Sequence, residues 1–185
     1  MAEHLSTSVA RTRDPRLQNA CAPLSILITE IINHHHEYLK QELPFIEGLL
    51  VQIARIPSDP CSQTAAALLP IFSRFRRELE AHMRREEVIL FPLIERLECA
   101  VTGGQLPPPN SFGPLSNAIQ FMNEDHDFEN KLLDQMTDIS GGFAGSSRSG
   151  VMERLRAMKL DIEIHVRKED ESLFPAAIRL EERQR

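Results

Sequence analysis

The sequence predicts an all-α protein, an up-down-up-down four-helix bundle, and three observations carry this prediction. Apolar residues recur in alternating steps of three and four, which is the spacing of one face of a helix. Stretches rich in proline and glycine divide the chain into four such segments. The alternation typical of half-buried strands is absent, and aromatic residues make up only 5% of the chain.

The domain organisation follows from the length and from the ends of the first segment. We expect residues 1–23, which are polar, to form a flexible N-terminal arm. Residues 24–182 are expected to form one bundle, because 185 residues suffice for a single domain with a substantial core. The first helix is predicted over about residues 24–55 and ends before Pro57 and Pro60.

The other three helices are bounded in the same way. The second is predicted over about residues 62–100, because residues 103–110 hold two glycines and three prolines that no helix accommodates. The third is predicted over about residues 114–139 and ends at a glycine pair that begins with Gly141. A loop of small residues then leads to the fourth helix, predicted over about residues 149–182.

The second and fourth helices contain the same motif, His-x-x-x-Glu-x-x-x-Leu-Phe-Pro. It begins at His82 and again at His165, 83 residues further along the chain. Residues four apart lie above one another on a helix, so each copy presents an imidazole beside a carboxylate, Glu86 or Glu169. In both copies the pair lies on the apolar stripe. A buried carboxylate without a partner is costly, so we expect a metal ion to meet it there.

The first and third helices each place one histidine on the apolar stripe, His36 and His126. The neighbouring His34 and His35 are rotated away from the stripe on a regular helix, and we expect them to face solvent or to stand behind the ligands. Each half of the chain therefore supplies one helix with a single histidine and one with a His-Glu pair. This predicts a pseudo-twofold repeat of two helix hairpins.

The candidate metal ligands are six residues: His36, His82, Glu86, His126, His165 and Glu169. They are too many for one tetrahedral zinc ion. They suit two ions, with each carboxylate bridging the pair and two histidines on each ion. A histidine-rich set with carboxylates favours iron, and manganese or zinc are acceptable substitutes.

Two further carboxylates lie close to the third helix's histidine in sequence. Glu129, one turn beyond His126, is interpreted either as an acceptor behind a ligand or as a seventh ligand. Asp125 is a candidate for orienting a ligand histidine, as carboxylates behind metal-bound imidazoles do.

Composition excludes several classes of partner. The net charge of −6 comes without a basic stripe, so no nucleic-acid partner is expected. No apolar run approaches the length of a membrane span, and the polar start is not a signal peptide. The three cysteines are scattered and form no CxxC pair. They are expected to be thiols of a cytoplasmic protein.

The sequence resembles the hemerythrin-like (HHE cation-binding) family over about residues 24–180. Within that family it is similar to the di-iron proteins of iron–sulfur cluster repair (RIC). The resemblance rests on four stretches: His36–Pro44, His82–Pro92, Glu124–Asp127 and His165–Pro175. It implies a hemerythrin-like bundle in which the six candidate residues ligate two iron ions. Oxygen-carrying hemerythrins use a fifth histidine, which the apolar stripes lack here, so the resemblance favours a repair-type site.

The function that the resemblance implies is that of a non-haem di-iron protein responding to nitrosative or oxidative stress. It would bind nitric oxide or dioxygen, or supply iron to damaged clusters, which makes iron–sulfur proteins its expected partners. The alternative is a non-enzymatic iron or oxygen sensor, or an oxygen-binding module. No nucleophile or phosphate loop is evident, and the sequence leaves open whether the protein is an enzyme. Repair proteins often carry an N-terminal domain with adjacent cysteines. None precedes residue 24, so we expect a stand-alone module.

Overall fold

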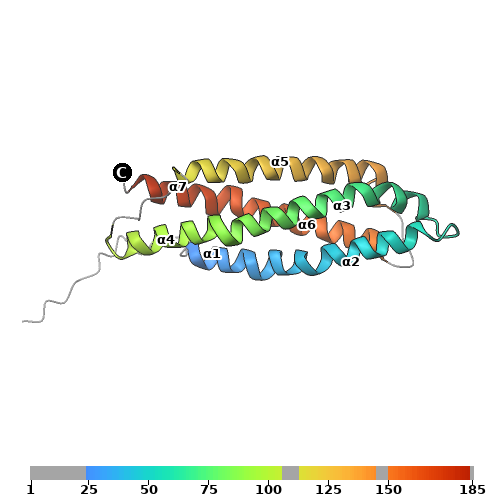
Figure 1. The fold of residues 1–185 in the computed structure, drawn as a ribbon, viewed down its shortest axis with the longest axis horizontal. Helices are drawn as coiled ribbons and strands as arrows, with labels where there is room; N and C mark the ends of the chain where they lie inside the picture. Colours follow the sequence, from blue (N-terminus) through green and yellow to red (C-terminus); the bar gives the residue numbers. More distant parts are fainter. Residues whose placement is uncertain (1–23, 106–112, 145–149, 184–185) are drawn as a thin grey trace, which may run out of the picture.

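The computed structural model describes residues 24–105, 113–144 and 150–183, and within these ranges it contains helices and no strand (Figure 1). The expected N-terminal arm, residues 1–23, lies outside the described residues. The predicted four helical segments are all present, and the predicted all-α fold is confirmed. No helix in the described ranges is long and apolar enough to cross a membrane.

Three of the four long helices are interrupted near their middle by a short π-helical segment. The first consists of α1 (Leu24–Ile31), η2 (Ile32–His36) and α2 (Glu37–Ala54). The second consists of α3 (Ser62–Arg85), η3 (Glu86–Leu90) and α4 (Phe91–Thr102). The third is the uninterrupted α5 (Leu115–Ser140). The fourth consists of α6 (Val151–Lys168), η4 (Glu169–Leu173) and α7 (Phe174–Glu182).

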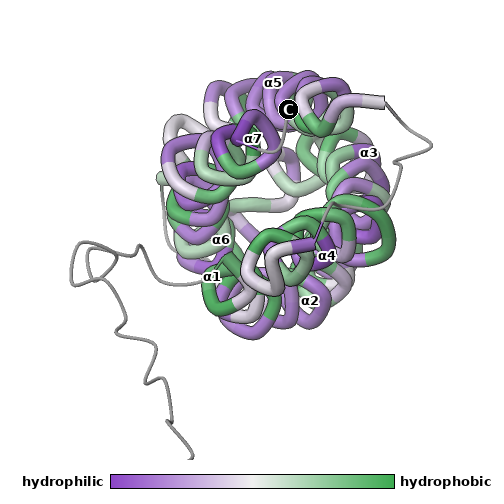
Figure 2. Tube along the Cα trace, turned by 90° about the vertical axis from the view of Figure 1, so that its left-hand side faces the viewer, coloured by the Kyte–Doolittle hydropathy of each residue, from purple (hydrophilic) through white to green (hydrophobic). Residues whose placement is uncertain are grey.

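Consecutive long helices run in opposite directions, which gives the predicted up-down-up-down bundle (Figure 1). Viewed along its length, the bundle has its helices arranged around a common axis (Figure 2). Helix α2 packs against α3 and α6, α3 packs against α5, and α5 contacts α7. The α5 helix ends in a left-handed turn at Gly141, whose φ of 62° favours a residue without a Cβ.

The two hairpins repeat each other in detail at the start of their first helix. The Glu98 carboxylate accepts hydrogen bonds from the backbone N–H groups of Leu24 and Ser25, at 2.6 and 3.0 Å. Glu181 accepts one from the backbone N–H of Leu115, at 3.0 Å. In each hairpin the second helix therefore caps the N-terminus of the first, where backbone donors lack partners within the helix. These matched caps agree with the predicted pseudo-twofold repeat.

The π segments lie where the candidate metal ligands are. In each segment a backbone N–H donates to the carbonyl five residues earlier, as from Glu37 to Ile32. Such a turn holds one residue more than a regular helical turn. Two of the segments, η3 and η4, are followed within two residues by Pro92 and Pro175, the prolines of the repeated motif. Proline cannot donate to the preceding turn, so a widened turn next to it is the expected accommodation.

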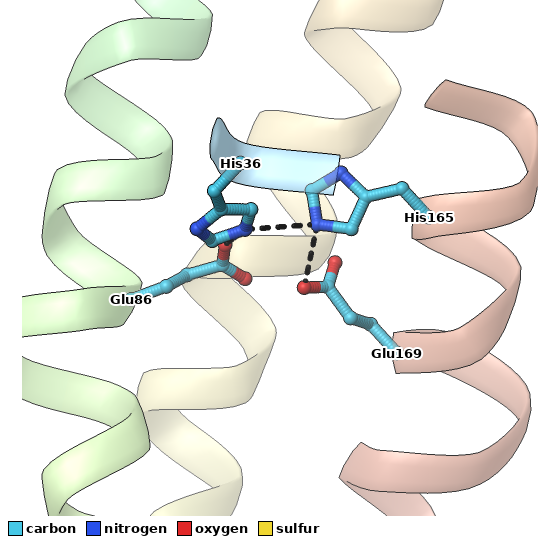
Figure 3. A group of neighbouring side chains, drawn as sticks. All are labelled: His36, Glu86, His165 and Glu169. Atoms are coloured by element: carbon cyan, nitrogen blue, oxygen red, sulfur yellow. Dashed lines mark hydrogen bonds and ion pairs between the residues drawn. The ribbon is translucent and has the colours of Figure 1, made fainter. Parts of the chain in front are cut away.

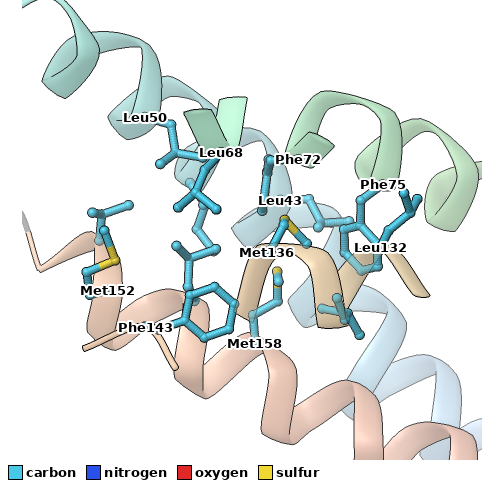
Figure 4. Packing of buried hydrophobic residues seen from close by; sticks show 14 of the residues in the cluster. Leu43, Leu50, Leu68, Phe72, Phe75, Leu132, Met136, Phe143, Met152 and Met158 are labelled. Atoms are coloured by element: carbon cyan, nitrogen blue, oxygen red, sulfur yellow. The ribbon is translucent and has the colours of Figure 1, made fainter. Parts of the chain in front are cut away.

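A polar layer divides the core into two apolar clusters. The large cluster, at the end formed by α2, α3, α6 and the second half of α5, is shown in part in Figure 4. It contains Leu39, Leu43, Ile46, Leu50, Ile53, Cys61, Ala65, Leu68, Phe72, Phe75, Leu79, Met83, Leu132, Leu133, Met136, Phe143, Val151, Met152, Leu155, Met158 and Ile162. The small cluster contains Leu24, Ile28, Ile31, Leu90, Phe91, Ile94, Leu97, Leu115, Ile119, Met122, Leu173, Phe174 and Ala177. Phe91 and Phe174, the phenylalanines of the two motif copies, are buried in this cluster.

Candidate metal centre

The six candidate ligands meet in the polar layer between the two apolar clusters. They come from all four long helices, and each is at most 3% exposed. Figure 3 shows four of them, with His36 and Glu86 facing His165 and Glu169 across the bundle axis. The structure thus brings together every residue that the sequence proposed as a ligand.

The ligand atoms fall into two groups of four that share both glutamates. One group consists of His36, Glu86, His165 and Glu169, and the other of His82, Glu86, His126 and Glu169. Within each group, one ligand atom from every residue lies within 4.8 Å of the others.

Each carboxylate divides its two oxygens between the groups. Glu86 Oε2 lies 3.4 Å from His36 Nε2, and its Oε1 lies 3.3 Å from His82 Nε2. Glu169 Oε1 lies 2.9 Å from His165 Nε2, and its Oε2 lies 3.3 Å from His126 Nε2. This is the arrangement that two carboxylates bridging a pair of ions require.

Unsatisfied polar atoms show that the site fits metal ions. Among the described residues, both oxygens of Glu86, one of Glu169, and Nε2 of both His82 and His126 are buried without a hydrogen-bond partner. Buried polar atoms are rarely left in this state, because each costs about 1–3 kcal/mol. Imidazole nitrogens and carboxylate oxygens are ligands for iron, manganese and zinc. The donor set and its unpaired atoms therefore match what two divalent ions would bind.

The electrostatics of the metal-free site point the same way. Burial alone would raise the pKa of Glu86, but His82 and His36 hold that pKa well below its ordinary value. Burial alone would lower the pKa of His126, yet the neighbouring carboxylates of Asp170 and Glu169 raise it to about 9. The raised pKa values of His82, His126 and His165 favour their protonated forms, which offset the charge of the buried carboxylates. Metal ions would take the place of those protons.

Carboxylates on the paired helix hold the outer nitrogen of two of the histidines. Glu87 accepts a hydrogen bond from His36 Nδ1 at 2.8 Å, and Asp170 accepts one from His126 Nδ1 at 3.1 Å. Each acceptor directly follows a bridging candidate in the sequence, Glu86 or Glu169. Such acceptors fix the ring orientation and direct Nε2 into the site, where His36 Nε2 lies 3.0 Å from His165 Nε2. The sequence analysis missed both, although an acidic residue directly after the motif glutamate recurs in both copies.

The outer nitrogen of His82 faces two carboxylates. His82 Nδ1 lies 3.6 Å from Asp125 Oδ2 and 3.8 Å from Glu129 Oε1. Asp125 thus lies beside a candidate ligand histidine, as expected of a residue that orients one. Glu129 belongs to neither group of four, so of its two interpretations the structure favours an acceptor behind a ligand. Burial raises the pKa of Glu129 to about 7.

His34 and His35 differ from each other more than the sequence suggested. His34 is exposed, as one of the two expectations had it. His35 is only 5% exposed, and its ring stacks on that of His165 with centroids 5.4 Å apart. The η2 segment explains the difference, because a regular helix would have turned His35 by about 100° from the stripe. His35 therefore packs against the ring of a candidate ligand, His165.

Comparison with known families and proteins agrees with this geometry. Residues 27–106 match the family model described as the hemerythrin HHE cation binding domain. The matched residues include the first three candidate ligands along the chain: His36, His82 and Glu86.

Similar proteins extend the likeness along most of the chain. The iron–sulfur cluster repair protein YtfE of Yersinia pseudotuberculosis (strain IP 31758) is 29% identical over 166 residues. The proteins of the same name from Citrobacter koseri and from Escherichia coli O1:K1 are each 26% identical over 162 residues. Each alignment covers 85% of this chain and 67% of the relative.

Proposed function

Since residues 27–106 belong to the hemerythrin HHE cation-binding family and the whole bundle is hemerythrin-like, we propose that this protein binds two iron ions. One ion is held by His36 and His165, the other by His82 and His126, and Glu86 and Glu169 bridge them. The observation that carries the proposal is the division of each buried carboxylate between two pairs of histidines.

The chain's own residues prepare this site before any ion arrives. Glu87 and Asp170 hold two of the imidazoles with Nε2 toward the centre. Phe91 stacks on the His36 ring at 5.7 Å and Phe174 on the His126 ring at 6.1 Å, so the small apolar cluster shields one side of the site. The large cluster begins one turn away on the other side, with Leu39, Leu79 and Met83. The ligands are thus oriented by hydrogen bonds and kept from bulk water.

When bound, iron would supply open coordination positions for nitric oxide or dioxygen, and iron itself for a damaged cluster. Six protein ligands for two ions leave such positions free. The similar proteins are named for iron–sulfur cluster repair. We therefore place this protein in iron–sulfur cluster repair under nitrosative or oxidative stress, with iron–sulfur proteins as its partners.

Anaerobic loading with iron(II) tests the proposal. We expect about two ions per chain by elemental analysis, and an optical spectrum that changes when nitric oxide is added. Retention of a single ion at saturation would refute the two-ion site. Rapid oxidation by dioxygen would agree with a redox role. A stable, reversible oxygen adduct would favour the alternative, an oxygen-binding module.

A pair of variants separates loss of the site from loss of the fold. Glu86→Ala removes a bridging carboxylate and should lower the metal content below one ion per chain. Glu95→Ala, nine residues further along the same long helix and exposed, is the matched control and should retain two ions. If Glu86→Ala still binds two ions, Glu86 is not a bridge.

A further inference from the structure

The two proposed ion positions are related by the pseudo-twofold repeat, but their surroundings are not. Glu87 and Asp170 are equivalent in the repeat, and each accepts from the single histidine of its own hairpin. The equivalence should extend to the residue that precedes that histidine. Asp125 precedes His126, whereas His35 precedes His36.

Asp125 and His35 occupy equivalent places behind the histidines of the repeated motif. The Asp125 carboxylate lies 3.6 Å from the outer nitrogen of His82, which is an ion-pair distance and not a hydrogen bond, since that nitrogen has no hydrogen-bond partner among the described residues. His35 lies against the equivalent histidine, His165, but as a parallel ring with an interplanar angle of 8°. A ring stacked on a face offers no acceptor to a nitrogen at the ring's edge. Of the four candidate ligand histidines, His165 is thus the one whose outer nitrogen has no carboxylate within 4.0 Å among the described residues.

His35 is itself held in this place. Its Nδ1 and Asp161 Oδ1 lie 2.9 Å apart, so the one nearby carboxylate of α6 is used to orient His35 and not His165. The Nε2 of His35 is buried and without a partner among the described residues. The stack is therefore a built contact between α6 and η2, fixed from behind by a hydrogen bond.

The two histidine pairs differ in the number of carboxylates behind them. Behind His82 and His126 lie three carboxylates, those of Asp125, Glu129 and Asp170. Arg85 pairs with the first of them at 2.6 Å. Among the described residues, Glu87 is the one carboxylate within 4.0 Å of an outer nitrogen of His36 or His165, and Lys40 pairs with it at 2.9 Å. Asp161 contacts His35 and not His165.

We propose that the two ion positions are inequivalent and that His35 makes them so: the ion held by His82 and His126 binds more tightly than the ion held by His36 and His165. This inference rests on the proposed two-ion site. The physical reason is that a carboxylate behind a metal-bound imidazole raises its basicity and fixes its orientation. Removing such a partner typically costs about 10–100-fold in metal affinity.

Stepwise titration of the metal-free protein tests this, with cobalt(II) as an optically visible probe and iron(II) under anaerobic conditions. We expect two binding steps whose dissociation constants differ by about 10-fold or more. Two steps of equal affinity in the wild-type protein would overturn the inference and leave the two-ion site intact. Binding of one ion or of none would instead refute the proposed function, and this inference with it.

Variants at the two equivalent positions assign the difference to its cause. His35→Asp places a carboxylate near His165, as Asp125 does near His82. It should lower the dissociation constant of the weaker binding step and bring the two dissociation constants closer together. His35→Phe is the matched control, because it keeps a stacked ring and supplies no acceptor, and it should retain the wild-type ratio of the two dissociation constants. Should His35→Asp fold poorly, Asp125→Asn probes the same difference from the other side by weakening the tighter step. If neither His35→Asp nor Asp125→Asn changed the ratio of the two dissociation constants, the proposed role of these residues would be overturned.

Discussion

The two ends of the bundle differ in what holds them together. The end with the large cluster is joined by apolar side chains from all four long helices, including Phe72 and Phe75, and by Phe143 from the turn after α5. The end with α1, α4 and α7 has a smaller apolar cluster, and it joins the rest of the core only across the polar layer of histidines and glutamates. Apolar contacts stabilise the first end without any ligand. The second end depends on whether the charges of the polar layer are balanced.

Metal removal is expected to act mainly on this second end. A bound ion stabilises the folded state by about 2.7 kcal/mol when its free concentration is 100 times its dissociation constant. We expect amides of α1, α4 and α7 to exchange about 100-fold faster in metal-free protein than in loaded protein. Amides of the first half of α3 should change much less. Hydrogen exchange read by mass spectrometry measures both regions in one experiment, and equal acceleration at both ends would contradict the comparison.

A pair of core substitutions sharpens the comparison. Phe75→Ala in the large cluster and Phe174→Ala in the small one should each lower the free energy of unfolding by about 3–5 kcal/mol. Phe75 packs near Phe72 and away from the ligands, so its substitution should leave metal affinity unchanged. Phe174 stacks on His126, so its substitution should also weaken metal binding. Denaturant unfolding with and without metal, followed by metal titration, distinguishes the two. If Phe75→Ala and Phe174→Ala had equal metal affinities, the small cluster would not support the metal site.

Most of the fold could be predicted from the sequence because each helix carries its own apolar stripe and ends at proline or glycine. The six candidate ligands could be predicted for the same reason, since all lie on those stripes. The bridging geometry of Glu86 and Glu169 was expected from the doubled motif, and the structure divides their oxygens accordingly.

What the sequence did not predict depends on contacts between helices and on local helix geometry. The partners of His36 and His126 lie on neighbouring helices, 51 and 44 residues away in the chain. The burial of His35 depends on a π turn, which the apolar pattern does not specify. In the second and fourth helices the motif proline hints at such a turn, but the first helix has no proline at the corresponding place.

The smallest expected effect is at His34, which lies within the widened turn of η2 but outside the polar layer. Its ring is exposed, and its Nδ1 lies 3.0 Å from the backbone carbonyl oxygen of Glu30. Surface substitutions without buried contacts usually change stability by less than about 0.5 kcal/mol. His34→Ala should therefore leave the melting temperature and the metal content unchanged, as calorimetry and elemental analysis would measure. His36→Ala, two residues on but fully buried in the ligand group, should lower the metal content. Loss of metal from the His34 variant and not from the His36 variant would mean that the widened turn holds a different histidine toward the site.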